Sequence, residues 1–124
     1  MQLVFLTAAC WGDGILDVTL HYASGEDERK ELQVLDWNPG TRQLAPAANQ
    51  RLAVQTRARR PDGSVAHEAE MFAQTIACDP QRSLQSLSIS LTKRENPRGL
   101  QQWQANFPRN FTAAIFAINA QRAE

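Results

Sequence analysis

Alternation of apolar and polar residues, with a period of two, limits the folds that this chain can adopt. Four apolar side chains in residues 15–22 alternate with polar ones: Leu16, Val18, Leu20 and Tyr22. In residues 86–91, leucine and isoleucine alternate with three serines. Successive side chains of a β-strand point to opposite faces, so both segments predict strands with one buried and one solvated face. No segment shows the 3.6-residue period of an amphipathic helix.

Turn residues divide the chain into about seven strand-like segments. Besides the two above, strands are expected at residues 3–9, 32–36, 51–59, 69–77 and 111–119. Within residues 51–59, the pattern predicts that Leu52, Val54, Thr56 and Ala58 share one face. The sequence RPDGS at residues 60–64 predicts a hairpin turn, and residues 94–110, with two prolines, predict a loop with at most one helical turn near residues 100–104.

These segments favour an all-β fold, an antiparallel β-sandwich of about seven strands. The chain has 124 residues, a length typical of one domain, so a single domain over residues 1–124 is expected. Thirteen basic residues balance thirteen acidic ones, which argues against nucleic acid and membrane surfaces as partners. No apolar run reaches the roughly 18 to 20 residues that span a bilayer. Two cysteines without CxxC spacing predict neither a disulfide framework nor a zinc site.

Several stretches carry a likeness to a known group of domains: LVFLTAACWGDG, VTLHYASGEDERKELQVLDW, MFAQTIACDP, LQSLSISL and AIFAIN. Their order resembles the jelly-roll, galactose-binding-like β-sandwich domains that accompany bacterial glycoside hydrolases, mannosidase-type enzymes among them. The resemblance covers roughly residues 3–119. It implies a noncatalytic accessory module that binds a saccharide or supports a glycosidase partner.

Asp36 and Trp37 end a predicted strand and have two interpretations. In the structural one, Trp37 plugs the end of the core and Asp36 caps the following loop through backbone N–H groups. In the functional one, the indole stacks on a pyranose ring while the carboxylate accepts hydrogen bonds from sugar hydroxyls. Large aromatic residues at strand ends are more often core than ligand contacts, so the structural interpretation is favoured.

Other candidate ligand-binding residues lie in turns or on a strand. Trp11 and Trp103 are in predicted turns or loops, where periodicity does not bury them, and are candidates for exposed stacking. Asp13 follows Trp11 in the same turn. Arg57 belongs to a basic cluster with Arg59 and Arg60 that is most simply a solvated strand edge. It is retained as a further candidate ligand contact.

Catalysis, metal binding and cofactors are not predicted. No two carboxylates are paired by the sequence in the way that glycoside hydrolysis requires. The two histidines, His21 and His67, lie on polar faces or near a turn, where a histidine with ordinary surface partners is expected rather than a catalytic base. Asp13 and Asp17 lack the loop pattern of a calcium site.

The alternative function is a structural or assembly domain that dimerises, or docks on a larger protein, through an exposed sheet edge. Related sandwiches place further strands before the first apolar strand, whereas this chain begins there. The continuous apolar run at residues 3–9 is by itself typical of a central strand covered on both faces. Without a preceding strand, however, an apolar open edge at residues 3–6 is expected, and a second copy is the simplest cover for it. This interpretation predicts a homodimer with its contact near the N-terminal strand.

Overall fold

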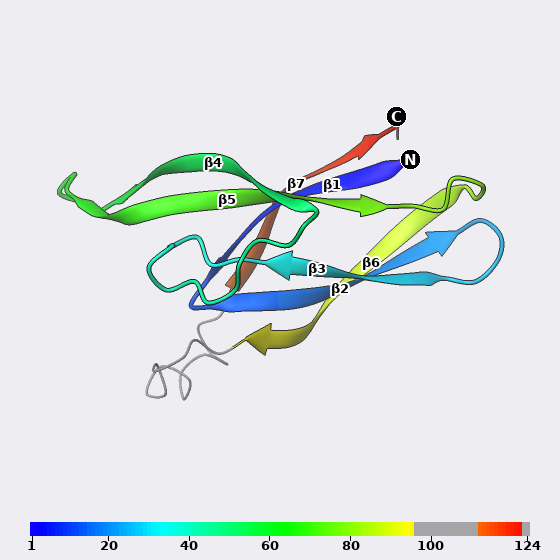
Figure 1. The fold of residues 1–124 in the computed structure, drawn as a ribbon, viewed down its shortest axis with the longest axis horizontal. Helices are drawn as coiled ribbons and strands as arrows, with labels where there is room; N and C mark the ends of the chain where they lie inside the picture. The colour runs from blue at the N-terminus through cyan, green and yellow to red at the C-terminus, as the bar shows by residue number, and fades with distance from the viewer. Residues whose placement is uncertain (96–111, 123–124) are drawn as a thin grey trace.

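Seven β-strands make up the fold (Figure 1). The computed structural model describes residues 1–95 and 112–122. The strands are β1 (Gln2–Cys10), β2 (Asp13–Tyr22), β3 (Glu28–Val34), β4 (Gln50–Arg59), β5 (Val65–Ala77), β6 (Leu84–Glu95) and β7 (Thr112–Gln121). Every ladder between two strands is antiparallel. The prediction of an all-β fold with about seven antiparallel strands is confirmed.

The strands form two sheets, one ordered β4-β5-β1-β7 and the other β3-β2-β6. The finer assignment to a jelly roll does not follow from this order and stays a prediction. The two ends of the chain lie side by side in Figure 1, where Gln2 of β1 pairs with Gln121 of β7. In the ranges that the structure describes, no helix is long and apolar enough to cross a membrane. The helical turn expected near residues 100–104 lies outside those ranges.

The core fills the space between the two sheets. Phe5 of β1, Val18 and Leu20 of β2, and Leu32 and Val34 of β3 are completely buried. Their spacing is the period-two pattern of the sequence, which confirms the predicted faces of these strands. The serine strand is confirmed as well. In β6 the serine side chains are exposed, while the alternate apolar residues Leu87 and Ile89 pack against the core.

The first strand is not an edge of its sheet, so the expected open edge at residues 3–6 is wrong. Leu3 lies opposite Ile76 of β5 on one side of β1 and opposite Ala120 of β7 on the other. The last strand returns to lie beside the first, a long-range pairing that local pattern cannot reveal. The homodimer predicted from an uncovered β1 loses its physical basis.

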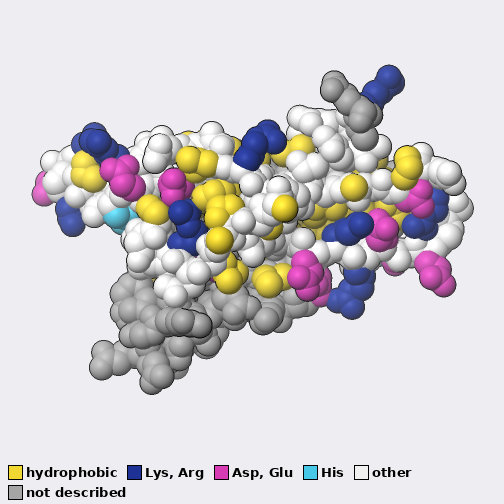
Figure 2. All heavy atoms as spheres, in the orientation of Figure 1, with side chains coloured by type: hydrophobic (Ala, Val, Ile, Leu, Met, Phe, Trp, Pro, Cys, Tyr) yellow, Lys and Arg dark blue, Asp and Glu magenta, His cyan; other side chains and the backbone are white. Residues whose placement is uncertain are grey.

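Strands β4 and β5 form a long hairpin whose turn projects beyond the second sheet (Figure 1). The predicted common face of β4 holds for Val54, Thr56 and Ala58 but is wrong for Leu52, because a β-bulge between Leu52 and Val54 shifts the register. Leu52 pairs with Phe72 but Val54 pairs with Met71, so the two side chains point to opposite faces, and both are exposed (45% and 38%). Figure 2 shows charged side chains gathered at the end of this hairpin.

Candidate functional site

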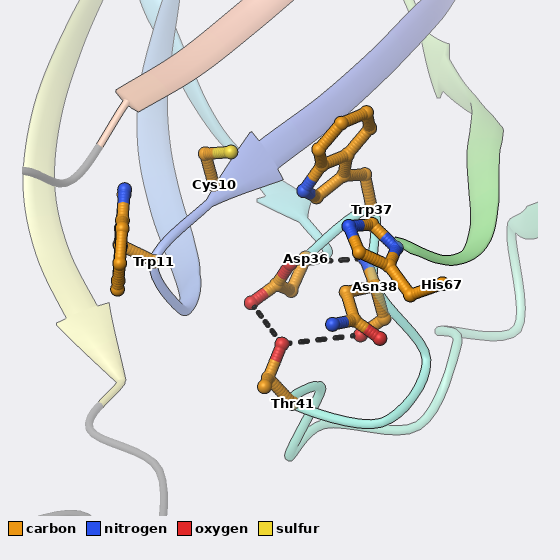
Figure 3. A pocket seen from close by; sticks show the side chains of 7 residues that line it. All are labelled: Cys10, Trp11, Asp36, Trp37, Asn38, Thr41 and His67. Atoms are coloured by element: carbon orange, nitrogen blue, oxygen red, sulfur yellow. Dashed lines mark hydrogen bonds between the residues drawn. The ribbon is translucent and has the colours of Figure 1, made fainter. Parts of the chain in front are cut away.

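A pocket of about 190 Å³ opens where β1 ends and the chain leaves β3 (Figure 3). Residues from three separate segments line it: Cys10, Trp11, Asp36, Trp37, Asn38, Thr41 and His67. The pocket brings together three of the residues singled out in the sequence, namely Trp11, Asp36 and Trp37. It adds Cys10, Asn38 and Thr41, which are close to a tryptophan in the sequence but were not site candidates, and His67, which no sequence signal placed near either tryptophan.

The segment after β3 creates the pocket by crossing into the four-stranded sheet. Ala9 N donates to the Leu35 carbonyl (2.9 Å), and Trp37 N donates to the Ala9 carbonyl (2.8 Å). On the other side, Glu70 N donates to the Trp37 carbonyl (2.8 Å). The β1–β5 ladder extends only to Thr7 and Phe72, so the backbone groups beyond it need other partners. Residues 35–37 supply these partners, and this insertion fixes the position of Trp37.

The carboxylate of Asp36 closes the loop that follows. Asp36 is only 1% exposed and accepts hydrogen bonds from Gly12 N (3.0 Å), Asn38 N (3.0 Å) and the Thr41 hydroxyl (2.8 Å). Figure 3 shows the carboxylate facing Thr41 at the floor of the pocket. The capping role foreseen for Asp36 is therefore confirmed. Its existing bonds leave little capacity to accept from a ligand.

Asp13 also accepts hydrogen bonds from backbone N–H groups of the loop, and it lies beneath Asp36. Its side chain is completely buried and accepts from Asp36 N (2.7 Å), Gln43 N (2.8 Å) and Leu44 N (2.8 Å). Buried polar groups are stable only with such partners. Asp13 does not line the pocket and holds the loop from beneath. In the described ranges, no group of three or more His, Cys, Asp or Glu side chains could hold a metal ion.

Trp37 lies at the wall of the pocket and is half-buried. Its ring contacts His67 edge to face, with 4.8 Å between the ring centroids and an angle of 85° between the planes. Trp37 is not a member of the buried core cluster between the sheets. The indole thus serves as a pocket wall rather than as a plug between the sheets.

Trp11 and Cys10 form the opposite wall. Trp11 is 44% exposed and has a φ of 65°, a left-handed conformation that few residues other than glycine adopt. Burial raises the pKa of the Cys10 thiol, and the charge of Asp36 raises it further, while the Trp11 backbone N–H acts in the opposite direction. The thiol is therefore protonated near neutral pH. It offers a small apolar surface rather than a nucleophile.

Polar contacts under the loop hold the pocket in place. Arg42 Nη1 lies 3.1 Å from Glu70 Oε1 in a largely buried ion pair, and the Arg42 guanidinium lies 4.9 Å from the centre of the Phe72 ring. Gln50 links strand and loop, because its amide donates to the Gln33 carbonyl (2.8 Å) and accepts from Ala47 N (3.1 Å). The loop after residue 37 is thus anchored to both sheets.

The remaining sequence candidates lie elsewhere. Arg57 is on β4, where its guanidinium is 3.4 Å from the carboxylate of Glu68, and both side chains are more than half exposed. It does not line the pocket. Trp103 falls outside the residues that the structure describes.

A second polar cluster occupies the solvent-facing side of the three-stranded sheet. His21 Nε2 lies 2.7 Å from the Ser88 hydroxyl, and His21 Nδ1 lies 3.0 Å from Asp27 Oδ2. This is the order of groups in a serine hydrolase triad, which the sequence did not indicate. His21 thus has two polar partners at the surface, and its noncatalytic role stays a prediction. None of these three residues lines the pocket between Trp11 and Trp37, or a smaller apolar pocket beside it that includes Ala8 and Phe116.

Comparison of the chain with protein-family models, with curated proteins and with solved structures found no match.

Proposed function

We propose that the protein is a noncatalytic carbohydrate-binding module that holds one sugar ring in the pocket between Trp11 and Trp37. The observation that supports this most is the meeting of two indoles from different segments at one small polar-rimmed pocket. Its volume of about 190 Å³ is below the roughly 300 to 1,000 Å³ of sites for drug-sized ligands. A single ring at the end of a glycan matches this size better than an internal stretch of chain.

The chemistry of a pyranose fits the two kinds of surface in the pocket. The C–H face of the ring is apolar and can stack on an indole, whereas its hydroxyls need hydrogen-bond partners. Trp11 is the exposed stacking surface. Asn38, Thr41 and His67 form the polar rim, and amide, hydroxyl and imidazole groups both donate and accept. Asp36 and Asp13 support the site through the backbone rather than by contact with the sugar.

A titration with single sugars tests this proposal. Neutral hexoses, N-acetylhexosamines and uronic acids are each titrated into the protein, with intrinsic tryptophan fluorescence and calorimetry as readouts. We expect one class to bind, and Trp11→Ala to weaken its binding by about tenfold or more, which corresponds to 1.4 kcal/mol. Trp11→Phe, which keeps an aromatic face, should recover part of the loss.

Leu52→Ala is the matched control, because Leu52 has nearly the same exposed fraction as Trp11 (45% against 44%) but lies on β4. Its sugar affinity should equal that of the wild type. Equal losses in the Trp11 and Leu52 variants, or no binding of any sugar class, would contradict the proposed site.

The noncatalytic part of the proposal has its own test at Ser88. Ser88 and its partners His21 and Asp27 are solvent-facing, and an activated serine also needs oxyanion donors and a bound substrate. We therefore expect no labelling of Ser88 by a fluorophosphonate probe, and hydrolysis of p-nitrophenyl acetate no faster than that of Ser88→Ala. Stoichiometric labelling of Ser88 that His21→Ala abolishes would show instead that the cluster is a catalytic site.

A further inference from the structure

Strand β7 is an edge of the four-stranded sheet. Among the strands that the structure describes, only β1 pairs with it. The other side of an edge strand presents a row of backbone N–H and C=O groups that can pair with another strand. Proteins usually protect such edges with charged side chains, prolines or bulges.

The four edge strands of the two sheets differ in this protection. The sequence of β3 has four charged residues out of seven, that of β4 has three arginines, and that of β6 ends in Lys-Arg-Glu. The sequence of β7, TAAIFAINAQ, has no charged residue, no proline and no glycine in ten positions. It has the composition of segments that readily add to other strands. Apart from one bulge at Phe116, the sequence of β7 has none of these protections, so its regular part is the edge most open to pairing.

Two large apolar side chains of β7 are exposed. Phe116 is 59% exposed and Ile118 is 44% exposed, although Ile118 lies opposite the completely buried Phe5. Phe116 also lines an apolar pocket of about 170 Å³ with Ala8 and Ala114. Because Ile118 shares the core-facing side of the sheet with Phe5, its exposure shows that the second sheet leaves this margin of the first sheet uncovered. A strand placed beside the regular part of β7 would cover Ile118 and pair backbone groups that no described strand pairs.

We propose that β7 pairs antiparallel with β7 of a second copy about a two-fold axis, which joins the two four-stranded sheets into one. A two-fold contact uses the same surface on both copies and closes after one pairing. Pairing of β7 with β4 of another copy would instead leave free edges at both ends and grow without limit. The arginines of β4 oppose that arrangement, whereas the uncharged β7 meets its own copy without like charges face to face.

The register of β7 indicates which half makes the contact. Strand β7 itself has a β-bulge at Phe116, because Ala117 lies opposite Leu6 while Ile115 lies opposite the next residue, Thr7. Residues 117–121 form a regular run opposite residues 2–6, and this run contains Ile118. Bulges hinder further pairing, so the contact is centred on residues 117–121.

Light scattering and sedimentation over a dilution series test the proposal. We expect a dimer that dissociates on dilution. Ile118→Lys and Ala117→Lys should each raise the dissociation constant by about tenfold or more, because each adds a solvated charge to the contact and, by symmetry, brings two like charges close to the two-fold axis. Val54→Lys is the matched control, because Val54 has a similar exposed fraction (38%) but lies on the β4 edge.

Circular dichroism and thermal melting establish that each variant is folded, and the exposed Ala117 guards against a folding defect specific to Ile118. A wild-type monomer at all usable concentrations would overturn the proposal. So would dissociation by Val54→Lys equal to that by Ile118→Lys, and so would open-ended assemblies in place of a dimer. Sugar binding involves a different set of residues, so the two proposals fail independently.

Discussion

At the scale of single residues, two buried carboxylates explain why the loop after β3 has a defined shape. Asp13 and Asp36 are almost completely buried, and each accepts hydrogen bonds from donors that lie more than twenty residues away. Backbone N–H groups of an irregular loop have no ladder to pair with, so carboxylates provide their acceptors. In the Asp-Trp pair that follows β3, Asp36 therefore fixes the loop through its hydrogen bonds, whereas Trp37 forms a wall of the pocket.

Asp13→Asn should destabilise the protein by about 2 kcal/mol. One side-chain oxygen would remain, while the new amide group would face at least one buried backbone N–H without accepting from it. Urea denaturation measures the loss. Asp62→Asn is the control, because Asp62 is exposed in a turn and accepts from the backbone N–H and hydroxyl of Ser64, so its midpoint should change much less. Equal changes in both variants would mean that burial of Asp13 is not the cause.

Thr7→Val should stabilise the protein by about 1 kcal/mol. Thr7 is 1% exposed, and its hydroxyl has no hydrogen-bond partner in the described part of the chain. Valine keeps the branched shape and removes the cost of an unpaired buried hydroxyl. Thermal melting measures the gain, and Thr75→Val, at a half-buried position on β5, provides the comparison. A lower melting temperature for Thr7→Val alone would show that the hydroxyl has a favourable contact after all.

At the scale of elements, the stability of each strand depends on how much of its surface is buried. Strands β2 and β3 alternate cleanly because one side faces the core and the other faces water. Most of β4 is exposed on both faces, since the hairpin projects beyond the opposite sheet. Its stability depends on pairing with β5 and on the turn, where Gly63 adopts a φ of 87°. Two-stranded ribbons are marginally stable alone, so this hairpin should open more easily than the core strands.

Ile89→Asp should unfold the protein or lower its stability by several kcal/mol. Ile89 packs against the core cluster from β6, and an aspartate there would place an unpaired carboxylate among apolar side chains. Ser86→Asp on the opposite face of the same strand should be close to neutral, because Ser86 is exposed and lies opposite His21. Circular dichroism and urea denaturation compare the two. Similar melting of both variants would show that the register of β6 is wrong.

At the scale of the whole molecule, the ladders join parts of the chain that are far apart in sequence. Strand β1 pairs with β5 and with β7, so the four-stranded sheet forms only after most of the chain has come together. Strand β2 likewise pairs with β6 across more than sixty residues. In such topologies the chain loses the entropy of loop closure before the stabilising contacts form.

Refolding should therefore take milliseconds to seconds, the range of two-state proteins dominated by non-local strand pairing. Stopped-flow fluorescence after dilution from urea measures the rate, with the tryptophans as probes. Measurements over a range of protein concentrations separate folding from any association step, which would be concentration-dependent. Folding in microseconds would contradict the observed strand order.

The sequence by itself determined the local features. Alternation placed β2 and β6 with the correct faces, and the RPDGS turn located the β4–β5 hairpin, because both signals depend on neighbouring residues. The same reasoning identified the capping role of Asp36, since an aspartate before a loop accepts bonds from nearby N–H groups.

Only the tertiary structure decided which segments meet. The position of β1 inside its sheet depends on the return of β7, and the bulge in β4 depends on its pairing with β5. The pocket also depends on tertiary structure. His67 and Trp11 lie near Trp37 because residues 35–37 cross between β1 and β5. A local pattern specifies the face and the turn of each strand. The neighbours of a strand are set by which long-range pairings bury the most apolar surface and satisfy the most backbone groups at once.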